Sequence, residues 1–389
     1  RKATMMAKGG APEVIVVGAG PSGLAASACL SMRGVPSLVL ERDDCVGSLW
    51  RKRTYDRLSL HLPKYASALP HAPHPADAPN YLPRDDFVRY LDGYAERFGV
   101  RTRLRRDVRA ARFDAARRRW DVEAVDLQTG EAERYAPRFL VVATGSYDEK
   151  FVPEVPGLEG FPGKVMHASE YRSAEGMMGK TVLVVGCGNS GMEIALDLAQ
   201  AGAITSIVVH ILTKWILNLG VTLGFYLPVW MIDKVVLLLC YLVFGDTSKH
   251  GIPRPAIGPF ARTQQTSVLP VIDVGTYNKI KSGEIQVISA GLKSVHGNVV
   301  EFADGRQYPF DAIVFATGYR SAIKRWLQDG GDLISDNGIL KQRSPKAENG
   351  LYYAGLSGRG IFGSAMDAEF IAGDISKQLF PQAQGKPDH

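Results

Sequence analysis

Two glycine-rich turns are the stretches of this chain whose residue types and spacing point most directly to chemistry. Residues 16–25 read "VVGAGPSGLA" and residues 184–193 read "VVGCGNSGME", so both follow the pattern G-x-G-x-x-G. Glycines at this spacing permit a tight turn, close approach of a pyrophosphate to the backbone, and close packing of a helix on a strand. A helix that begins there offers N–H groups and the positive end of its dipole to phosphate. The sequence therefore predicts two dinucleotide sites. Their glycines are Gly18, Gly20, Gly23, Gly186, Gly188 and Gly191.

The two turns differ in the residue expected at the end of the next strand. Glu41 ends the apolar run "PSLVLE" after the first turn, where an acid hydrogen-bonds ribose hydroxyls. The matching position after the second turn lies near Val209 or His210, and no acid is present there. An acid would repel a 2′-phosphate, which needs a cation instead. The second turn therefore favours a dinucleotide with a 2′-phosphate.

The elements that position these turns are two strand–turn–helix–strand units. "EVIVVGAG", "PSGLAASACLSMRG" and "PSLVLER" form the first, and the same order returns over 181–209. Apolar runs ending in "ATG" follow each unit, and proline-rich stretches at 69–83 and 151–163 must be irregular. We expect an α/β fold with two Rossmann-like dinucleotide-binding domains, the second inserted into the first. The predicted boundaries are 1–150 and 319–389 for the first domain and 151–318 for the second.

Composition limits the remaining functions. The chain has 389 residues, a net charge of +6 and 22% charged residues, and much of its positive charge lies in 101–119. That stretch lacks the aromatic spacing of a nucleic-acid stacking platform, so we interpret it as a solvated strand pair and expect no nucleic-acid partner. The cysteines Cys29, Cys45, Cys187 and Cys240 include no C-x-x-C pair. Their spacing suggests neither a zinc site nor the redox pair of a disulfide reductase.

Two apolar runs, 215–232 and 235–244, bear on membrane association. Pro228 and two glycines interrupt the first run, and the second is too short to span a bilayer. We favour two buried or interfacial helices over a membrane span. No secretory signal opens the sequence and the cysteines fit a reducing compartment. We therefore expect a cytoplasmic protein, with the surface of the endoplasmic reticulum as the alternative.

The stretch "FPGKVMHASEY" carries a more specific signal. It fits F-x-G-x-x-x-H-x-x-x-Y through Phe161, Gly163, His167 and Tyr171. This pattern between two glycine turns resembles the class B flavin-dependent monooxygenases, and the final Tyr resembles their flavin-containing monooxygenase branch. Within that branch "GCGNSGMEIALDL", "IGPF", "PVIDVGTYNKIKSGEIQV" and "MDAEFIAGDI" resemble the plant YUCCA enzymes.

The resemblance implies a function and two cofactors. It implies FAD at the first turn, NADPH at the second, and a small α-keto acid and O2 as substrates. YUCCA enzymes convert indole-3-pyruvate to indole-3-acetate, the plant hormone auxin, through a C4a-(hydro)peroxyflavin. Reduced flavin reacts with O2 far more readily than NADPH does, which is why such an enzyme holds two dinucleotides. That chemistry requires neither a side-chain nucleophile nor a metal, and no metal site is predicted.

Matched positions assign the site residues. His61 and Asn189 would lie near the flavin, but neither is a certain catalytic residue, and a structural role for His61 is equally supported. His167 is expected to hold the interdomain stretch in shape. The residues expected to hold FAD are Gly18, Gly20, Gly23, Glu41, Gly47, Ser48, Leu49, Trp50, His61, Val108, Thr144 and Gly145. Those expected to hold NADPH are Gly186, Gly188, Asn189, Ser190 and Gly191.

One departure from the family pattern lies after Val209. YUCCA-like chains carry an Arg–Ser pair there that would grip the 2′-phosphate, whereas this chain is shorter and reads "VVHILTKW". His210 or Lys214 would have to supply the missing cation. Two alternatives therefore stay open: a broad N- or S-oxygenating monooxygenase, and an FAD-binding relic with impaired use of NADPH.

Overall fold

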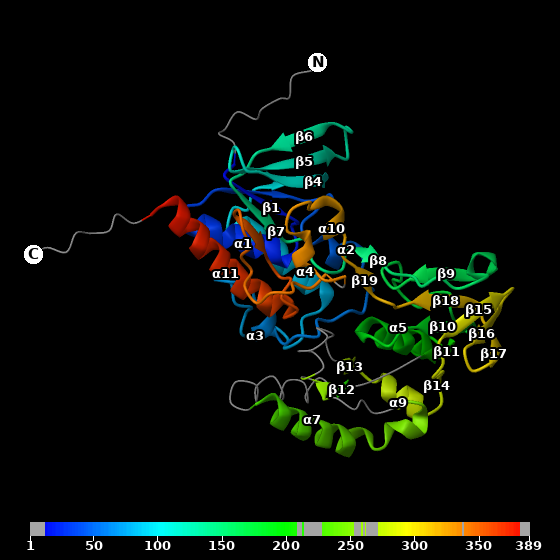
Figure 1. The fold of residues 1–389 in the computed structure, drawn as a ribbon. Coiled ribbons are helices and arrows are strands. Elements are labelled where there is room, and N and C mark those ends of the chain that lie inside the picture. Colours follow the sequence, from blue (N-terminus) through cyan, green and yellow to red (C-terminus); the bar gives the residue numbers. More distant parts are fainter. Residues whose placement is uncertain are drawn as a thin grey trace, which may run out of the picture. The chain divides into compact units, whose positions relative to one another are not determined.

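The chain folds into two compact units (Figure 1). This computed structural model describes residues 12–207, 212–213, 228–252, 258–259, 261, 271–336 and 338–381. The first unit comprises Arg1–Arg51, Leu62–Glu149 and Tyr319–His389, and the second comprises Lys52–His61 and Lys150–Gly318. Residues 52–61, which the sequence assigned to the first domain, are thus part of the second unit. The α/β class predicted from the sequence is confirmed.

The first unit is built on a five-stranded parallel sheet in the order β20-β7-β1-β2-β3. Its central strands are short and apolar, and all four residues of β1 are buried. Such runs predict strands that are covered on both faces. The strands are β1 (Val14–Val17), β2 (Ser37–Leu40), β3 (Thr102–Arg103), β7 (Phe139–Val142) and β20 (Leu351–Tyr353). The helices are α1 (Pro21–Met32), α2 (Ser48–Lys52), α3 (Lys64–Ser67), α4 (Arg84–Arg97), α10 (Ile323–Trp326) and α11 (Gly360–Leu379).

An antiparallel sheet of β4 (Arg106–Asp114), β5 (Arg119–Asp126) and β6 (Ala132–Tyr135) also belongs to the first unit. Most of the basic stretch 101–119 forms this strand pair, as predicted. Arg106 lies 2.7 Å from Asp126 and 3.1 Å from Glu133, and Arg117 lies 2.8 Å from Asp121. These arginines are therefore paired with acids of the same sheet.

The second unit repeats the parallel architecture, with the strand order β14-β11-β10-β18-β9. Its strands are β9 (Lys164–His167), β10 (Thr181–Val185), β11 (Ile204–Ile207), β14 (Ile285–Val287) and β18 (Ala312–Phe315). An antiparallel sheet joins β15 (Leu292–His296), β16 (Val299–Phe302) and β17 (Gln307–Pro309), and β12 (Leu212–Thr213) pairs with β13 (Ile272–Asp273). The helices include α5 (Asn189–Gln200), α7 (Val229–Phe244) and α9 (Thr276–Lys281). Strands β8 (Glu149–Lys150) and β19 (Tyr319–Arg320) lie where the chain passes between units.

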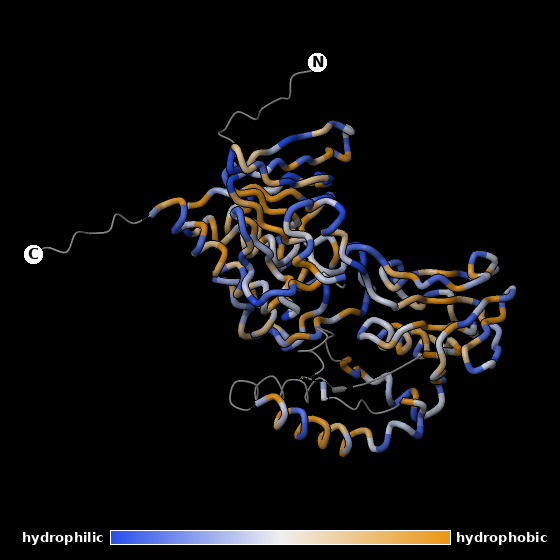
Figure 2. The backbone as a smooth tube through the Cα atoms, viewed as in Figure 1, coloured by the Kyte–Doolittle hydropathy of each residue, from blue (hydrophilic) through white to orange (hydrophobic). Residues whose placement is uncertain are grey.

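Helix α7 corrects the expectation for the apolar runs. One helix joins the end of the first run to all of the second, and residues 215–227 lie outside the described residues. Asp233 on this helix is buried and accepts a hydrogen bond from the Ala261 N–H, so the helix turns its acid inward. Much of this helix is hydrophobic in sequence (Figure 2). Ile232, Val236 and Phe244 are buried, whereas eight other apolar side chains are exposed: Trp230, Met231, Val235, Leu237, Leu238, Tyr241, Leu242 and Val243. Across the described ranges, every helix is too short or too polar to cross a membrane.

Candidate dinucleotide sites

The first glycine turn follows β1 directly and has the geometry that a pyrophosphate requires. Gly18 has a φ of +103°, and α1 begins after Gly20 with Pro21 in its first turn. A Cβ on Gly23 would lie 1.9 Å from the Gly18 carbonyl oxygen, so only glycine permits this contact between turn and helix. A Cβ on Gly20 would meet no described atom within 4 Å. The turn is therefore closely packed at Gly23 and open at Gly20.

Glu41 directly follows β2 and is hydrogen-bonded to this turn. One carboxylate oxygen accepts a 2.7 Å hydrogen bond from the Ala19 N–H, and the other accepts a 2.9 Å bond from the Asp43 N–H. Burial raises the pKa of this carboxyl, and the two N–H donors partly offset that effect. Each carboxylate oxygen has a second lone pair that can accept a hydroxyl proton. Glu41 is thus held by the turn and can still bind a ribose.

The stretch Gly47–Trp50 closes against the same turn. The Gly47 N–H donates a 2.9 Å hydrogen bond to the Ala19 carbonyl, and its φ of +60° favours glycine. Ser48 and Leu49 are half-buried in α2, and the Trp50 ring meets Phe87 edge-on at 4.9 Å. The predicted ribityl-binding residues are therefore placed next to the first glycine turn.

Two buried hydroxyls in the first unit have no hydrogen-bond partner among the described residues: Thr144 Oγ1 and Ser357 Oγ. Thr144 follows β7 and Ser357 follows β20, and these two strands are neighbours in the parallel sheet. Both therefore lie at the carboxyl edge of the sheet, where ligands bind in open α/β folds. A buried hydroxyl without a partner costs free energy, so a ligand that bonds to these groups would stabilise the fold. The donor set thus fits a dinucleotide.

The sequence analysis missed the turn that carries Ser357. This turn joins β20 to α11, and Gly355 in it has a φ of +75° and donates from its N–H to the Asp367 carboxylate at 2.9 Å. The signal was present in "LYYAGLSGRGIFG", where an apolar strand ends in glycines before a helix. Val108, which was predicted to contact FAD, lies in β4 and its side chain is buried. Gly145, also predicted to contact FAD, directly follows Thr144.

The second glycine turn has the same backbone. Gly186 has a φ of +115° after β10, and α5 begins after Gly188. A Cβ on Gly191 would lie 2.1 Å from the Gly186 carbonyl oxygen, while one on Gly188 would meet no described atom within 4 Å. The Asn189 side-chain oxygen accepts a 2.7 Å hydrogen bond from the Ile272 N–H of β13. The polar side chain that opens this helix is therefore already bound to the protein on one side.

His61 lies in the second unit, in contact with α5. Its Nε2 is 2.7 Å from the carboxylate of Glu193, which is only 3% exposed. Arg57 of the same segment lies 3.2 Å from Asp197, one turn further along α5. Burial and the Glu193 carboxylate raise the pKa of Tyr55, which is also in this segment. Glu193 was not predicted from the sequence; its signal was the first of the two acids in the largely apolar helix "GMEIALDL".

His167 and Tyr171 hold the chain in place after β9. The ring of His167 is buried, with Nε2 3.0 Å from the Gly318 carbonyl and Nδ1 2.9 Å from the Ser169 hydroxyl. Burial lowers the pKa of His167. The Tyr171 hydroxyl donates a 2.6 Å hydrogen bond to Asp197 of α5. These contacts agree with the structural role expected for His167.

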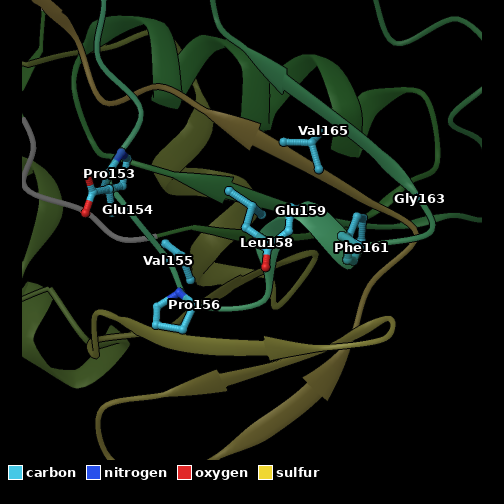
Figure 3. Close-up of a pocket in the computed structure, with 9 residues that line it drawn as sticks. All are labelled: Pro153, Glu154, Val155, Pro156, Leu158, Glu159, Phe161, Gly163 and Val165. Atoms are coloured by element: carbon cyan, nitrogen blue, oxygen red, sulfur yellow. The ribbon is translucent and has the colours of Figure 1, made fainter.

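A shallow hollow lies beside the stretch 153–165 (Figure 3). Gly163 and Val165 of its lining stand at the amino end of β9, which runs parallel to β18 and, through it, to β10. Gly186 stands at the carboxyl end of β10, so the hollow and the glycine turn occupy opposite edges of one sheet. The hollow is therefore separate from the second dinucleotide site. Of the shortened stretch after Val209 the structure describes only β12, and His210 and Lys214 lie outside the described residues.

Two parallel sheets, each with a glycine turn at the start of a helix, form two Rossmann-like units, a fold that solved flavin monooxygenases share. A solved structure of an oxidized steroid monooxygenase bound to NADP aligns with a TM-score of 0.72 and 17% identity, over 96% of this chain and 88% of that chain. At this identity the likeness establishes the shared fold. The prediction of two Rossmann-like units is confirmed.

Sequence comparison places the chain within this class. The family model described as flavin-binding monooxygenase-like matches residues 11–330. The chain is 46% identical over 373 residues to probable indole-3-pyruvate monooxygenase YUCCA10 of Arabidopsis thaliana, covering 94% of this chain and 97% of that protein. It is also 46% identical to indole-3-pyruvate monooxygenase YUCCA1 of Oryza sativa subsp. japonica, covering 94% and 92%. The chain belongs to the flavin-binding monooxygenase-like family, in its YUCCA branch, as its motifs predicted.

Proposed function

We propose that this chain is an FAD- and NADPH-dependent monooxygenase that converts indole-3-pyruvate to indole-3-acetate. The observation that carries the proposal is the 46% identity to YUCCA10 over nearly the full length of both proteins. The overall reaction consumes one α-keto acid, O2, NADPH and a proton, and yields the acid shortened by one carbon, CO2, water and NADP⁺. One oxygen atom of O2 enters the new carboxyl group and the other leaves as water.

We infer that the first unit holds FAD. The N–H groups at the start of α1 would bind the pyrophosphate next to Gly20, where no Cβ blocks the approach. Glu41 would accept hydrogen bonds from the ribose hydroxyls. The hydroxyls of Thr144 and Ser357, which have no partner in the described structure, would bond to the cofactor at the same edge of the sheet. The residues that would pack along the ribityl chain are Gly47, Ser48, Leu49 and Trp50. Two further residues would border the cofactor, Val108 and Gly145. When bound, the flavin supplies the reaction with O2.

We infer that the second unit holds NADPH. Gly186, Gly188 and Gly191 would place the start of α5 against its pyrophosphate, as the equal geometry of the two turns supports. Asn189 and Ser190 lie in the first turn of this helix, within reach of a phosphate. The sequence carries no acid near Val209, so a 2′-phosphate meets no repulsion from that position. His61 would act as a positioning residue that holds the Glu193 side chain of α5, because its imidazole is bound to that carboxylate.

Product analysis tests the proposal. The purified yellow protein is incubated with NADPH, indole-3-pyruvate and ¹⁸O2, and the products are identified by mass spectrometry. We expect indole-3-acetate with one ¹⁸O atom, in proportion to the NADPH consumed. A protein with bound FAD that makes no product above the no-enzyme control would overturn the proposal. Parallel incubations with an amine and a sulfide distinguish it from broad N- or S-oxygenation.

A further inference from the structure

Three side chains of the first unit form a cluster away from the dinucleotide site. Cys29 lies on α1, Glu369 on α11, and His71 in the proline-rich stretch 69–83. The thiol sulfur, an imidazole nitrogen and a carboxylate oxygen all lie within 4.8 Å of one another. Cys29 is nine residues after Gly20, which corresponds to about 13 Å along the helix axis. We propose that Cys29, His71 and Glu369 bind one Zn²⁺ ion, with water as its fourth ligand.

The chemistry of the three groups selects this ion. Thiolate, imidazole and carboxylate are the side-chain ligands that zinc uses in proteins, whereas Ca²⁺ and Mg²⁺ take oxygen ligands. Around a tetrahedral zinc the ligand atoms are about 3.4 Å apart, from metal–ligand bonds of roughly 2.0–2.3 Å. No pair of the three ligand atoms is more than 4.8 Å apart, so the separations must shorten by at most about 1.4 Å, while His71 and Glu369, now 2.5 Å apart, must separate slightly. His71 and Glu369 are partly exposed, with side-chain exposures of 40% and 37%, so they can move toward the buried sulfur of Cys29.

The chain holds His71 in an unusual position that aims it at Glu369. His71 has a φ of +62° after Pro70, the third position of a type II turn, where Gly or Asn is the ordinary residue. The Tyr90 hydroxyl accepts a 2.7 Å hydrogen bond from the Leu69 N–H and donates one to the Ala72 carbonyl at 2.8 Å. The turn is therefore held from both ends, and His71 Nε2 lies 2.5 Å from the Glu369 carboxylate.

Glu369 also has an arginine beside it. Arg33, at the end of α1, lies 2.9 Å from the other carboxylate oxygen. An ordinary surface ion-pair network is therefore the competing explanation for His71 and Glu369. In that explanation the buried Cys29 thiol only hydrogen-bonds to Glu369, whereas zinc would take the sulfur as a ligand. The two explanations also make different predictions for the removal of Arg33. This arginine competes with a metal for the Glu369 carboxylate, so a zinc site should bind its ion more tightly without it.

Zinc titration of the flavin-loaded protein tests the proposal. Zn²⁺ is added in competition with a fluorescent chelator, and bound metal is counted by mass spectrometry of the intact protein. We expect one Zn²⁺ per chain, at least tenfold weaker binding in each of Cys29→Ala, His71→Asn and Glu369→Gln, and tighter binding in Arg33→Ala. Excess Mg²⁺ should not displace the ion. His71→Asn keeps a residue that tolerates positive φ, so it retains the turn.

Matched controls make the result decisive. Cys240→Ala and His296→Asn remove one thiol and one imidazole elsewhere, and both should bind zinc like the wild type. Replacing Zn²⁺ with Co²⁺ should give a thiolate-to-metal absorption band in the difference spectrum against the metal-free protein, and Cys29→Ala should lack this band. Equal zinc binding by the wild type and the three ligand variants would overturn the proposal. Loss of the site in a control variant, or weaker binding in Arg33→Ala, would also overturn it.

Discussion

The two glycine turns have nearly the same backbone but different surroundings. Gly18 and Gly186 have φ values of +103° and +115°, and the added Cβ of Gly23 and Gly191 would lie 1.9 and 2.1 Å from the preceding turn. The shared geometry suits the pyrophosphate that both dinucleotides contain. Discrimination between the cofactors must therefore come from neighbouring residues, and Glu41 is the clearest difference.

The two "ATG" stretches also match in sequence but differ in their surroundings, and the difference is seen at their threonines. Thr144 follows β7 and its buried hydroxyl has no partner among the described residues. Thr317 occupies the matching place after β18, and its hydroxyl donates to the carbonyl of Phe151. One threonine therefore has its hydroxyl available for a ligand, while the other fixes the stretch between units. Equivalent sequence positions have different tasks in the two units.

The largest effect is expected from Gly23→Ala. Its Cβ would lie 1.9 Å from the Gly18 carbonyl, so the turn must open, at a cost of about 1–3 kcal/mol or more. We expect the protein to lose most of its flavin and to melt at a lower temperature. Gly20→Ala is the matched control, because its Cβ meets no described atom within 4 Å. This control should leave the melting temperature of the apoprotein unchanged and weaken only flavin binding. Full flavin content in Gly23→Ala would contradict the assignment.

Glu41→Gln should have the next largest effect. Loss of a charge-assisted hydrogen bond to ribose costs about 1.5–3 kcal/mol, or about ten- to a hundred-fold in affinity. Titration of the apoprotein with FAD, followed by flavin fluorescence, measures this change. Asp44→Asn removes an exposed acid nearby and should bind FAD normally. An unchanged FAD affinity in Glu41→Gln would show that this carboxylate serves only the turn.

Substitutions of Thr144 and Thr317 should have smaller effects, and the two variants should differ in which property changes. Thr144→Val removes a buried hydroxyl without a partner, so the apoprotein should be equally or more stable while FAD binding weakens severalfold. Thr317→Val removes a made hydrogen bond and should lower the free energy of unfolding by about 1 kcal/mol without changing FAD affinity. Urea unfolding of the apoproteins and FAD titrations measure the two quantities. The contrast fails if both variants show the same pattern.

The smallest effect is expected on the pH dependence of stability, and it arises from His167 in the second unit. Burial lowers the pKa of His167 in the folded protein, so the unfolded chain binds the proton more readily. Stability from this histidine is complete above its unfolded pKa of about 6.5 and is lost as the pH falls through and below that value. Urea midpoints at several pH values should therefore fall less on acidification in His167→Asn than in the wild type. An identical pH dependence would show that His167 does not titrate with unfolding.

The sequence predicted local features well because each is written within a few residues. Glycine spacing between an apolar strand and a helix predicts a Rossmann-like unit, and the structure contains two such units, of which only the first has an acid at the position of Glu41. The prediction of two separate helices at 215–232 and 235–244 was wrong in part, because α7 continues through Asp233 and Lys234, and hydropathy cannot show that Asp233 is buried. The contact of His61 with Glu193 also depends on folding, since it joins residues far apart in the chain. Ser357 was missed although "GRGIFG" at 358–363, directly after it, also fits G-x-G-x-x-G and leads into a helix.

Gly191→Ala tests the central claim that the two equal turns hold different cofactors. The measurement is flavin content together with the rate of flavin reduction by NADPH in a stopped-flow instrument, with dithionite reduction as the control. We predict wild-type flavin content, normal reduction by dithionite, and at least tenfold more NADPH required for half-maximal reduction. Loss of flavin with unchanged use of NADPH, or reduction by NADPH as in the wild type, would contradict the account.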